Sequence, residues 1–394
     1  MIQKKLLIIN QHFSVGGIKR SLENLIPVLK RNYDVKVIFL CGEIKKFNNK
    51  YPDTLIESPF ILSSLLSSLK DIKNMNYKYL RIVIKIIGFV LSKVFGMEKI
   101  VNFSIRCSKN LGKYDCVISY SHDNWFENGN FFGGGNYLAI HKTQSNKKIA
   151  WIHGELSTIG LTKDRLFKTY SLFNYVITVS EACKRQFDLL SNNKIICKRI
   201  YNLSNIANIQ NKIKGYKYKA DKNIFKIVTV GRISKIAKRM DKINEIAKKL
   251  KENGYKFKWT IIGNGSEYEN CINIAKCYGI TDVVEYLGEK SNPYIYMLQS
   301  DLFVLVSDTE SMSMVIRESL IVGTPVVTTN FPAAYESIVN GKNGFIVNKD
   351  ISSLYEKIAY CIEHKEILDN FRDYINKNPL SDDMTIQEIL NIIE

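Results

Sequence analysis

Short apolar runs alternate with amphipathic helical patterns along most of the 394-residue chain, and this alternation restricts the fold more than any other feature. Each β-rich run is followed by polar or glycine-containing sequence, and then by apolar residues spaced three and four apart. Strands that alternate with helices run parallel in a sheet, because each helix carries the chain back to the same edge. The pattern therefore predicts the α/β class.

The alternation is clearest in the second half. In the first half the expected strands are Leu6–Asn10, Val35–Leu40, Cys116–Tyr120, Lys148–Ile152 and Tyr175–Val179. In the second half they are Lys226–Val230, Lys258–Ile262, Val284–Leu287, Leu302–Val306 and Val326–Thr328, with helices near Asp241–Asn253, Glu267–Tyr278 and Met314–Val322. This order is typical of a doubly wound, Rossmann-like domain.

The length favours two domains of roughly 200 residues each, since a single core rarely grows larger. The expected linker is Asn202–Ala220, which is rich in Asn, Lys and Tyr and poor in apolar periodicity. We predict Rossmann-like domains at 1–205 and 206–375 that face a cleft, and a final helix at 376–394 that packs back on the first domain. Ligands of such domains bind at the carboxyl ends of the strands.

Positive charge is concentrated in the first half of the chain. Residues 1–205 hold 31 Lys and Arg against 14 Asp and Glu, whereas residues 206–394 hold 25 against 24. A general compositional habit does not spare one half, so the first half is expected to face something anionic. No nucleic-acid-binding module is recognisable. We therefore expect an anionic membrane surface as a partner, and no nucleic acid.

The segment Leu80–Val101 is very apolar but is interrupted by Arg81, Lys85, Lys93 and Lys99. One interpretation is an interfacial helix whose cations snorkel while the apolar side chains enter the lipid surface. The other is a buried core helix with lysines at its rim. Both interpretations remain open from the sequence.

Other features favour a cytoplasmic protein that is peripheral on the inner face of the cell membrane. No apolar stretch is long enough for a transmembrane helix, and the amino-terminal residues do not resemble a signal peptide. None of the eight cysteines forms a C-x-x-C pair, which is typical of reduced thiols.

Residues 301–329 are the most informative stretch. Glu310 ends a loop after a buried strand, Ser311 and Ser313 stand where a helix begins, and Glu318 lies on that helix. A helix amino terminus offers unpaired N–H groups and a positive dipole end, which suit a diphosphate. The carboxylates suit sugar or ribose hydroxyls. On spacing alone, Glu310 and Ser311 fit a simple capping role equally well.

The same stretch resembles a known family. Glu310 and Glu318 are spaced like the E-x7-E motif of the retaining, GT-B-fold glycosyltransferases of family 4 (group 1 glycosyltransferases), and Leu320–Val327 is similar to that family's A-x-G-x-P-V-V run. Further likenesses occur in the expected order at Thr229–Ser234 with Lys238 and Asp241, at Ile261–Gly265, and at Val284–Gly288 with Pro293 and Tyr296. They cover most of 225–350 and are looser over 1–205.

The resemblance implies transfer of a sugar from a UDP- or GDP-sugar to an acceptor hydroxyl with retention, without a cofactor. Arg232 and Lys238 would neutralise the leaving diphosphate without a metal, and Glu310 and His153 complete the expected catalytic set. The expected donor-binding residues are Gly16, Gly17, Gly231, Gly263, Leu287, Ser311, Met312, Ser313, Met314 and Glu318. The acceptor is expected to be a saccharide or lipid-linked saccharide of bacterial surface polysaccharide or glycolipid assembly.

Other interpretations are less favoured or remain open. Gly16-Gly17 is not the G-x-G-x-x-G fingerprint, so a dehydrogenase is disfavoured. Asp308-Thr309-Glu310 is an alternative metal site, although Glu310 fits the longer motif better. The family usually has glycines after this glutamate, whereas this chain has Ser311-Met312-Ser313, which leaves open a binding subunit without transfer. A nucleotide-sugar epimerase of the same architecture is the other alternative.

Overall fold

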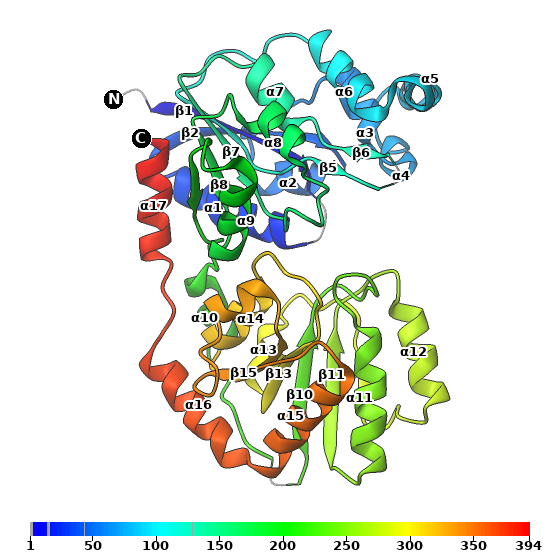
Figure 1. Cartoon of the computed structure of the whole chain (residues 1–394), viewed down its shortest axis with the longest axis vertical. Coiled ribbons are helices and arrows are strands. Elements are labelled where there is room, and N and C mark those ends of the chain that lie inside the picture. The colour runs from blue at the N-terminus through cyan, green and yellow to red at the C-terminus, as the bar shows by residue number, and fades with distance from the viewer. Residues whose placement is uncertain (1–2, 14–15, 43, 128, 222) are drawn as a thin grey trace. The chain divides into compact units, whose positions relative to one another are not determined.

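The computed structural model describes residues 3–13, 16–42, 44–127, 129–221 and 223–394. By its internal contacts the chain divides into two compact units. Unit 1 comprises Met1–Leu203 and Thr385–Glu394, and unit 2 comprises Ser204–Met384. Each unit is built around one parallel sheet (Figure 1).

Unit 1 contains a parallel sheet in the order β3-β2-β1-β4-β7-β8-β9. The strands are β1 (Lys4–His12), β2 (Tyr33–Cys41), β3 (Leu55–Ile56), β4 (Cys116–Ser119), β7 (Lys147–Ile152), β8 (Tyr175–Thr178) and β9 (Cys197–Arg199), and a hairpin adds β5 (Asn124–Trp125) and β6 (Phe131–Phe132). The helices are α1 (Gly17–Leu29), α2 (Lys45–Lys50), α3 (Phe60–Leu66), α4 (Leu69–Ile72), α5 (Lys78–Phe95), α6 (Met97–Arg106), α7 (Gly135–His141), α8 (Lys163–Tyr170), α9 (Glu181–Ser191) and α17 (Asp383–Ile393).

Unit 2 contains a parallel sheet in the order β12-β11-β10-β13-β14-β15. Its strands are β10 (Phe225–Val230), β11 (Phe257–Ile262), β12 (Val284–Tyr286), β13 (Leu302–Leu305), β14 (Val326–Thr329) and β15 (Gly344–Val347). Its helices are α10 (Ile206–Ile213), α11 (Asp241–Glu252), α12 (Tyr268–Cys277), α13 (Tyr294–Leu298), α14 (Met314–Ile321), the 3₁₀ helix η1 (Pro332–Glu336), α15 (Ile351–Glu363) and α16 (Lys365–Lys377).

Strand β10 shows why such runs are mostly apolar. Ile227 packs into one core with Ile243 of α11, whereas Val228 and Val230 pack into another with Ile316 of α14. Successive side chains of a strand point to opposite faces, so a strand covered by helices on both faces needs apolar residues on both of them rather than in strict alternation. The doubly wound pattern expected from the sequence is thus present in unit 2.

The helices correct one expectation and bear on a question that the sequence left open. The expected linker Asn202–Ala220 contains helix α10, whose Ile209 is fully buried in the core of unit 2. The apolar segment Leu80–Val101, for which the sequence left an interfacial and a core helix open, spans α5 and the start of α6: Gly88 is the one buried residue of α5, whereas Val101 of α6 is fully buried in the core of unit 1. None of the helices in the described residues combines the length and apolar content that crossing a membrane requires.

Candidate functional site

In unit 2 the strand order reverses direction between β10 and β13, which are neighbours in the sheet. The chain winds outward from β10 to β11 and β12 on one side, and from β13 to β14 and β15 on the other. The loops that leave β10 and β13 therefore run in opposite directions from the carboxyl ends of these strands. Open α/β sheets bind ligands at such a switch point.

Three strand ends beside the switch point are joined by glycines. The N–H of Gly231 donates to Ile262 O, and the N–H of Gly263 donates to Gly288 O, both at 2.9 Å. Gly263 has φ +145°, and a Cβ placed on it would lie 1.8 Å from the carbonyl oxygen of Gly231. No other residue type fits there without moving the backbone. Leu287, another expected donor-binding residue, extends the β12 end through its N–H, which donates to Ile261 O at 2.9 Å.

The structure brings two of the expected catalytic residues together. The Lys238 ammonium, on the loop after β10, donates to Glu310 Oε1, on the loop after β13. Ser307 Oγ donates to the same oxygen at 2.9 Å. The Glu310 side chain is 10% exposed and that of Lys238 is 21% exposed. Arg232 lies on the Lys238 loop, directly after Gly231, and is exposed.

Asp308 holds this pair of loops in place, a role that the sequence did not predict. Its Oδ1 accepts from Lys242 Nζ at 2.6 Å and its Oδ2 from Arg239 Nη1 at 2.8 Å. Its N–H donates to Ala237 O at 2.9 Å, which ties the Glu310 loop to the Lys238 loop. Burial raises the pKa of Asp308, but the bonds from Lys242 and Arg239 outweigh burial and hold that pKa below its ordinary value. Asp308 is thus ionised and paired with Arg239 and Lys242.

The alternative metal site at Asp308-Thr309-Glu310 is already occupied by cations of the protein. Both carboxylates are paired, Glu310 with Lys238 and Asp308 with Arg239 and Lys242. Over the described ranges, no group of three or more His, Cys, Asp or Glu side chains is arranged to hold a metal ion.

Helix α14 begins beside Glu310. Ser313 is its N-cap residue but makes no side-chain cap bond, and within the described part of the chain its buried Oγ has no hydrogen-bond partner. Ser311 and Met312 are half-buried, Met314 is buried, and Glu318 is fully buried on the second turn. The helix start thus combines positive dipole character with a buried hydroxyl that has no partner among the described residues.

In unit 1, His153 follows β7 and is 7% exposed. Its ring stacks on Trp151 and lies 4.7 Å from the Tyr120 ring, and its N–H donates to His122 Nδ1 at 3.2 Å. Burial, together with the neighbouring His122, lowers the pKa of His153 to about 3, and burial lowers that of His122 to about 4. Both imidazoles are therefore neutral at physiological pH. His122 is not among the site residues expected from the sequence.

The switch point of unit 1 lies between β1 and β4. Gly16 has φ +152° and is the N-cap of α1, which Gly17 begins, and residues 14 and 15 just before them lie outside the described residues. Ser21 of α1 is 2.6 Å from the hydroxyl of Tyr120, which stands beside His153. The remaining expected site residues belong to unit 2.

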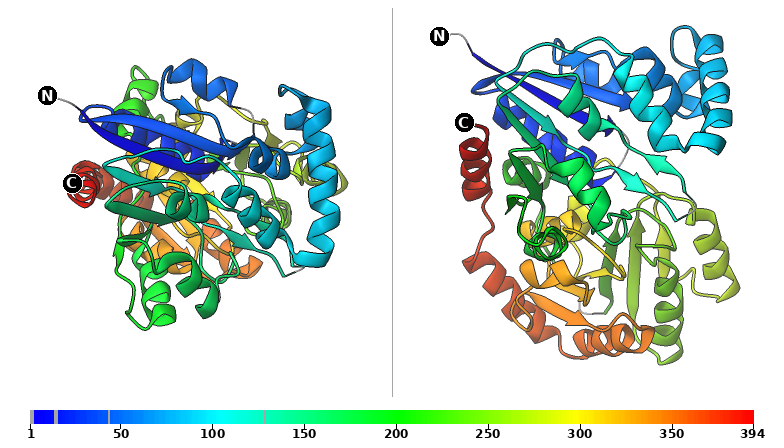
Figure 2. Two further views of the ribbon diagram at one scale, coloured as in Figure 1. Left: turned by 90° about the horizontal axis from the view of Figure 1, so that it is seen from above. Right: turned by 45° about the horizontal axis from the view of Figure 1, so that its top comes forward.

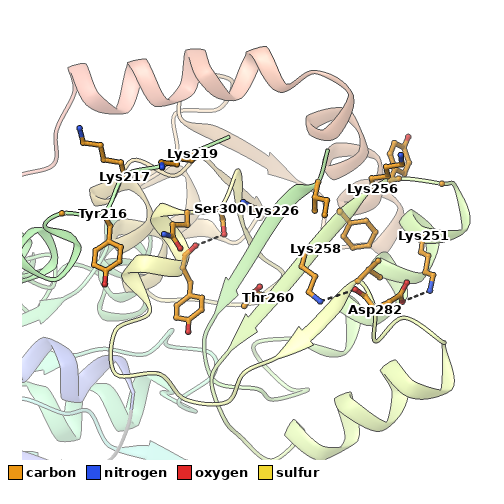
Figure 3. A pocket seen from close by; sticks show the side chains of 18 residues that line it. Tyr216, Lys217, Lys219, Lys226, Lys251, Lys256, Lys258, Thr260, Asp282 and Ser300 are labelled. Carbon is orange, nitrogen blue, oxygen red and sulfur yellow. Dashed lines mark hydrogen bonds and ion pairs between the residues drawn. The ribbon is translucent and has the colours of Figure 1, made fainter. Parts of the chain in front are cut away.

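A pocket of about 1100 Å³ lies elsewhere in unit 2, at the amino ends of β10 and β11 (Figure 3). It is lined by Lys217, Lys219, Lys226, Lys251, Lys256 and Lys258 among others. Lys251 Nζ and Lys258 Nζ contact Asp282 at 2.7 Å and 3.3 Å, through its Oδ1 and its carbonyl oxygen respectively. The pocket is at the wrong edge of the sheet for a switch-point ligand, so it is a separate surface that we call the lysine pocket.

Residues 210–378 match the family model of the glycosyl transferases group 1. The match spans most of unit 2, including both loops that carry Lys238 and Glu310. It agrees with the resemblance found in the motifs.

Curated relatives are similar over parts of their length. An uncharacterised glycosyltransferase of Haemophilus influenzae is 24% identical over 254 residues, which cover 62% of this chain and 67% of that protein. The capsular polysaccharide biosynthesis glycosyltransferase CapM of Staphylococcus aureus is 31% identical over 160 residues, which cover 40% of this chain and 42% of that protein.

Solved structures are similar over nearly the whole chain. HepE of Anabaena, solved in complex with UDP, has a TM-score of 0.67 at 16% identity and covers 98% of both chains. The lipopolysaccharide outer core galactosyltransferase WaaB has a TM-score of 0.63 at 17% identity and covers 99% of both. Identities this low bear on the fold alone, and they confirm the predicted GT-B class with two Rossmann-like parallel sheets.

Proposed function

We propose that this chain is a retaining glycosyltransferase that moves a sugar from a UDP- or GDP-sugar to an acceptor hydroxyl. The observation that carries the proposal is the Lys238–Glu310 pair at the β10/β13 switch point, inside the segment that matches the glycosyl transferases group 1. It sets a cation and a carboxylate beside glycine-joined strand ends. A diphosphate sugar needs both kinds of group.

The cations serve the leaving group. When the bond between the anomeric carbon and the diphosphate breaks, its electron pair stays on the phosphate oxygen and negative charge grows there. We assign neutralisation of that charge to Arg232 and Lys238, where the guanidinium offers a fork and the ammonium a point charge. The acceptor hydroxyl attacks from the same face, and its proton passes to the leaving phosphate oxygen, which gives retention.

Glu310 and the start of α14 serve the sugar and the diphosphate. Within the described residues, the contacts of the Glu310 carboxylate fall on Oε1, which leaves Oε2 to accept from a sugar hydroxyl. Ser313 Oγ and the N–H groups at the start of α14 are suited to the diphosphate. Gly16, Gly17 and His153 remain proposals of the same kind in unit 1: close backbone approach for the glycines, and a neutral hydrogen bond to a sugar hydroxyl for the imidazole.

For the acceptor we propose a saccharide or lipid-linked saccharide at the inner face of the cell membrane, bound by unit 1. CapM is named for capsular polysaccharide biosynthesis, and other relatives for O-antigen and colanic acid biosynthesis. Unit 1 also holds the excess of positive charge, which suits a lipid diphosphate.

The first experiment measures thermal unfolding with UDP, GDP and their sugars, because a ligand that binds only the folded chain raises the unfolding midpoint by mass action. Transfer from the donor that binds is then compared between the wild type, Glu310→Ala and Glu245→Gln, a matched control at an exposed carboxylate of α11. We expect Glu310→Ala to lose at least about 100-fold in turnover with its fold intact, and the control to behave like the wild type.

Different outcomes separate the alternatives. No midpoint shift with any nucleotide sugar would overturn the proposal. A shift without transfer or donor hydrolysis would favour a binding subunit, which the serines at positions 311 and 313 leave possible. Isomerisation of the donor without an acceptor would favour an epimerase.

A further inference from the structure

Helix α5 exposes its apolar side chains. It stands at the periphery of unit 1 (Figure 2), where it packs on α3, α4 and α6. Most of its large apolar side chains are 40% to 76% exposed, and they are Tyr79, Leu80, Val83, Ile86, Ile87, Phe89, Val90, Leu91, Val94 and Phe95. So many exposed apolar side chains on one helix are uncommon on the surface of a soluble monomer and mark an interaction site.

Two of the four cations of α5, Arg81 and Lys85, point inward instead. Arg81 Nη1 donates to Ser63 Oγ at 2.8 Å and to Ser64 Oγ at 3.1 Å, both on α3. Lys85 Nζ donates to Leu65 O at 3.0 Å and to Ser67 O at 2.7 Å, at the carboxyl end of α3. In the interfacial interpretation these two cations snorkel toward lipid, but the structure turns them toward α3, where serine hydroxyls accept from Arg81 and the carbonyl oxygens of Leu65 and Ser67 accept from Lys85.

This inward anchoring sets the rotation of the helix. Gly88 lies on the anchored face, where an added Cβ would be 2.1 Å from Leu65 Cδ2. Val83, Ile86, Val90 and Val94 recur at intervals of three and four residues, so they share one face of α5. That face is turned away from Arg81, Lys85 and Gly88. The polar contacts of α5 therefore fix its rotation so that these four apolar residues, which we call the Val83–Val94 stripe, face outward.

The charge around the Val83–Val94 stripe indicates which kind of partner can cover it. Residues 72–97 contain five Lys and Arg and no Asp or Glu. Lys78 and Lys93 are exposed at the two ends of α5, and Tyr77 and Tyr79 flank its amino end with 75% and 74% exposure. A second copy of the chain would bring like charges together. An anionic bilayer offers acyl chains to the stripe, and phosphates to the lysines and tyrosine hydroxyls.

We propose that α5 docks unit 1 in the plane of an anionic lipid surface, with the Val83–Val94 stripe in the acyl boundary. Ile61 of α3, Leu69 of α4 and Phe103 of α6, the helices on which α5 packs, are also 44%, 55% and 66% exposed. The inference deepens the proposed membrane-side acceptor, but it does not depend on the chain being a transferase.

The test is flotation of the full chain with vesicles of phosphatidylcholine, with and without phosphatidylglycerol, at low salt. The variant combines Ile86→Gln, Val90→Gln and Val94→Gln, which change no charge and favour a helix at least as well as Ile or Val. We expect the wild type to bind the anionic vesicles at least about tenfold more tightly than the variant. Equal binding of the two proteins would overturn the proposal.

A matched control separates docking from general attraction. Lys217→Gln with Lys219→Gln and Lys256→Gln removes three cations of the lysine pocket and leaves α5 intact. We expect this control to bind anionic vesicles like the wild type, and a loss as large as that of the α5 variant would contradict a specific role for α5. Equal wild-type binding to pure phosphatidylcholine would contradict the charge argument.

Two further measurements complete the test. Light scattering without lipid checks for a dimer, and a wild-type dimer that becomes monomeric in the α5 variant would show that the stripe packs on a second copy. The thermal midpoint with and without UDP is measured on every variant. An α5 variant that loses vesicle binding but keeps its UDP shift supports docking independently of the donor site, whereas vesicle binding without any UDP shift would fault the proposed function alone.

Discussion

Lys238 and Glu310 form an ion pair across two loops that leave neighbouring strands, β10 and β13, at the point where the sheet changes direction. Seventy-two positions separate the two residues. The pair is thus a product of strand order, and its neighbours are the natural places to test how the site works.

Arg232→Ala is expected to lower turnover about 100-fold while leaving the unfolding midpoint unchanged, because the side chain is exposed. If the guanidinium meets the diphosphate, the variant should also lose affinity for UDP more than for UMP. Calorimetric titration with both nucleotides measures this. Lys235→Ala, an exposed cation on the same loop, is the control, and an equal loss in both variants would argue against a specific role for Arg232.

Gly263→Ala is expected to destabilise unit 2 by about 3 kcal/mol or more, because a positive φ is combined with a backbone clash against Gly231. Gly254→Ala is the matched control. Gly254 also has a positive φ, +78°, but an added Cβ there meets nothing within 4 Å, so its cost should be about 1 kcal/mol. Urea unfolding compares them, and equal costs would contradict the close packing of the strand ends.

Asp308→Asn is expected to cost about 2 kcal/mol, because it leaves the Lys242 ammonium, whose side chain is 4% exposed, without its counter-charge. Adding Lys242→Met should recover part of that loss. The pKa of Asp308 is depressed in the folded state, so its contribution is present above its ordinary value of 3.8 and disappears as the pH falls through the lower folded value. When the pH falls below 3.8, the wild type should therefore lose more stability than Asp308→Asn.

The paired histidines predict a second pH dependence, in unit 1. Their folded pKa values, about 4 for His122 and about 3 for His153, lie below the ordinary 6.5. Stability is therefore complete above pH 6.5 and falls toward pH 4, by up to about 1.4 kcal/mol per pH unit for each histidine. Burial raises the pKa of Asp123 to about 6, so this carboxyl takes up a proton in the folded state more readily than in the unfolded state and opposes the loss of stability. It accounts for one proton, whereas the two histidines account for two.

His122→Asn keeps an acceptor for the His153 N–H but does not titrate. We expect it to unfold with a shallower pH dependence than the wild type between pH 6.5 and pH 4. Denaturant unfolding across that range decides the matter. The same slope in both proteins would mean that His122 is not held neutral by burial.

The fold class followed from the sequence because parallel strands covered by helices leave a strong alternating pattern, as in β10 and α11. The elements that the sequence did not predict are short or depend on partners distant in sequence. Helix α10 is eight residues long within a polar segment, and its reason to form is the burial of Ile209 against another part of unit 2.

The residues of the candidate site likewise fall into those that the sequence predicted and those that it did not. The sequence named Glu310 and Lys238, since both stand in a motif with its own spacing. It missed Asp308 as the anchor of two loops, because that role exists only where β13 lies beside β10. Likewise, nothing local distinguishes Arg81 and Lys85, which face α3, from Lys93, which faces outward. The direction of a helical side chain depends on what the helix packs against.

Helix α17 has a consequence for the order in which the chain is made. Its last turns belong to unit 1, where Ile389, Ile392 and Ile393 are buried and Glu388 pairs with Arg199 at 3.3 Å. A ribosome therefore releases all of unit 2 before it supplies the residues that close the core of unit 1. During synthesis the second unit can finish first, and the amino-terminal unit lacks the buried isoleucines of α17 until residues 385–394 are made.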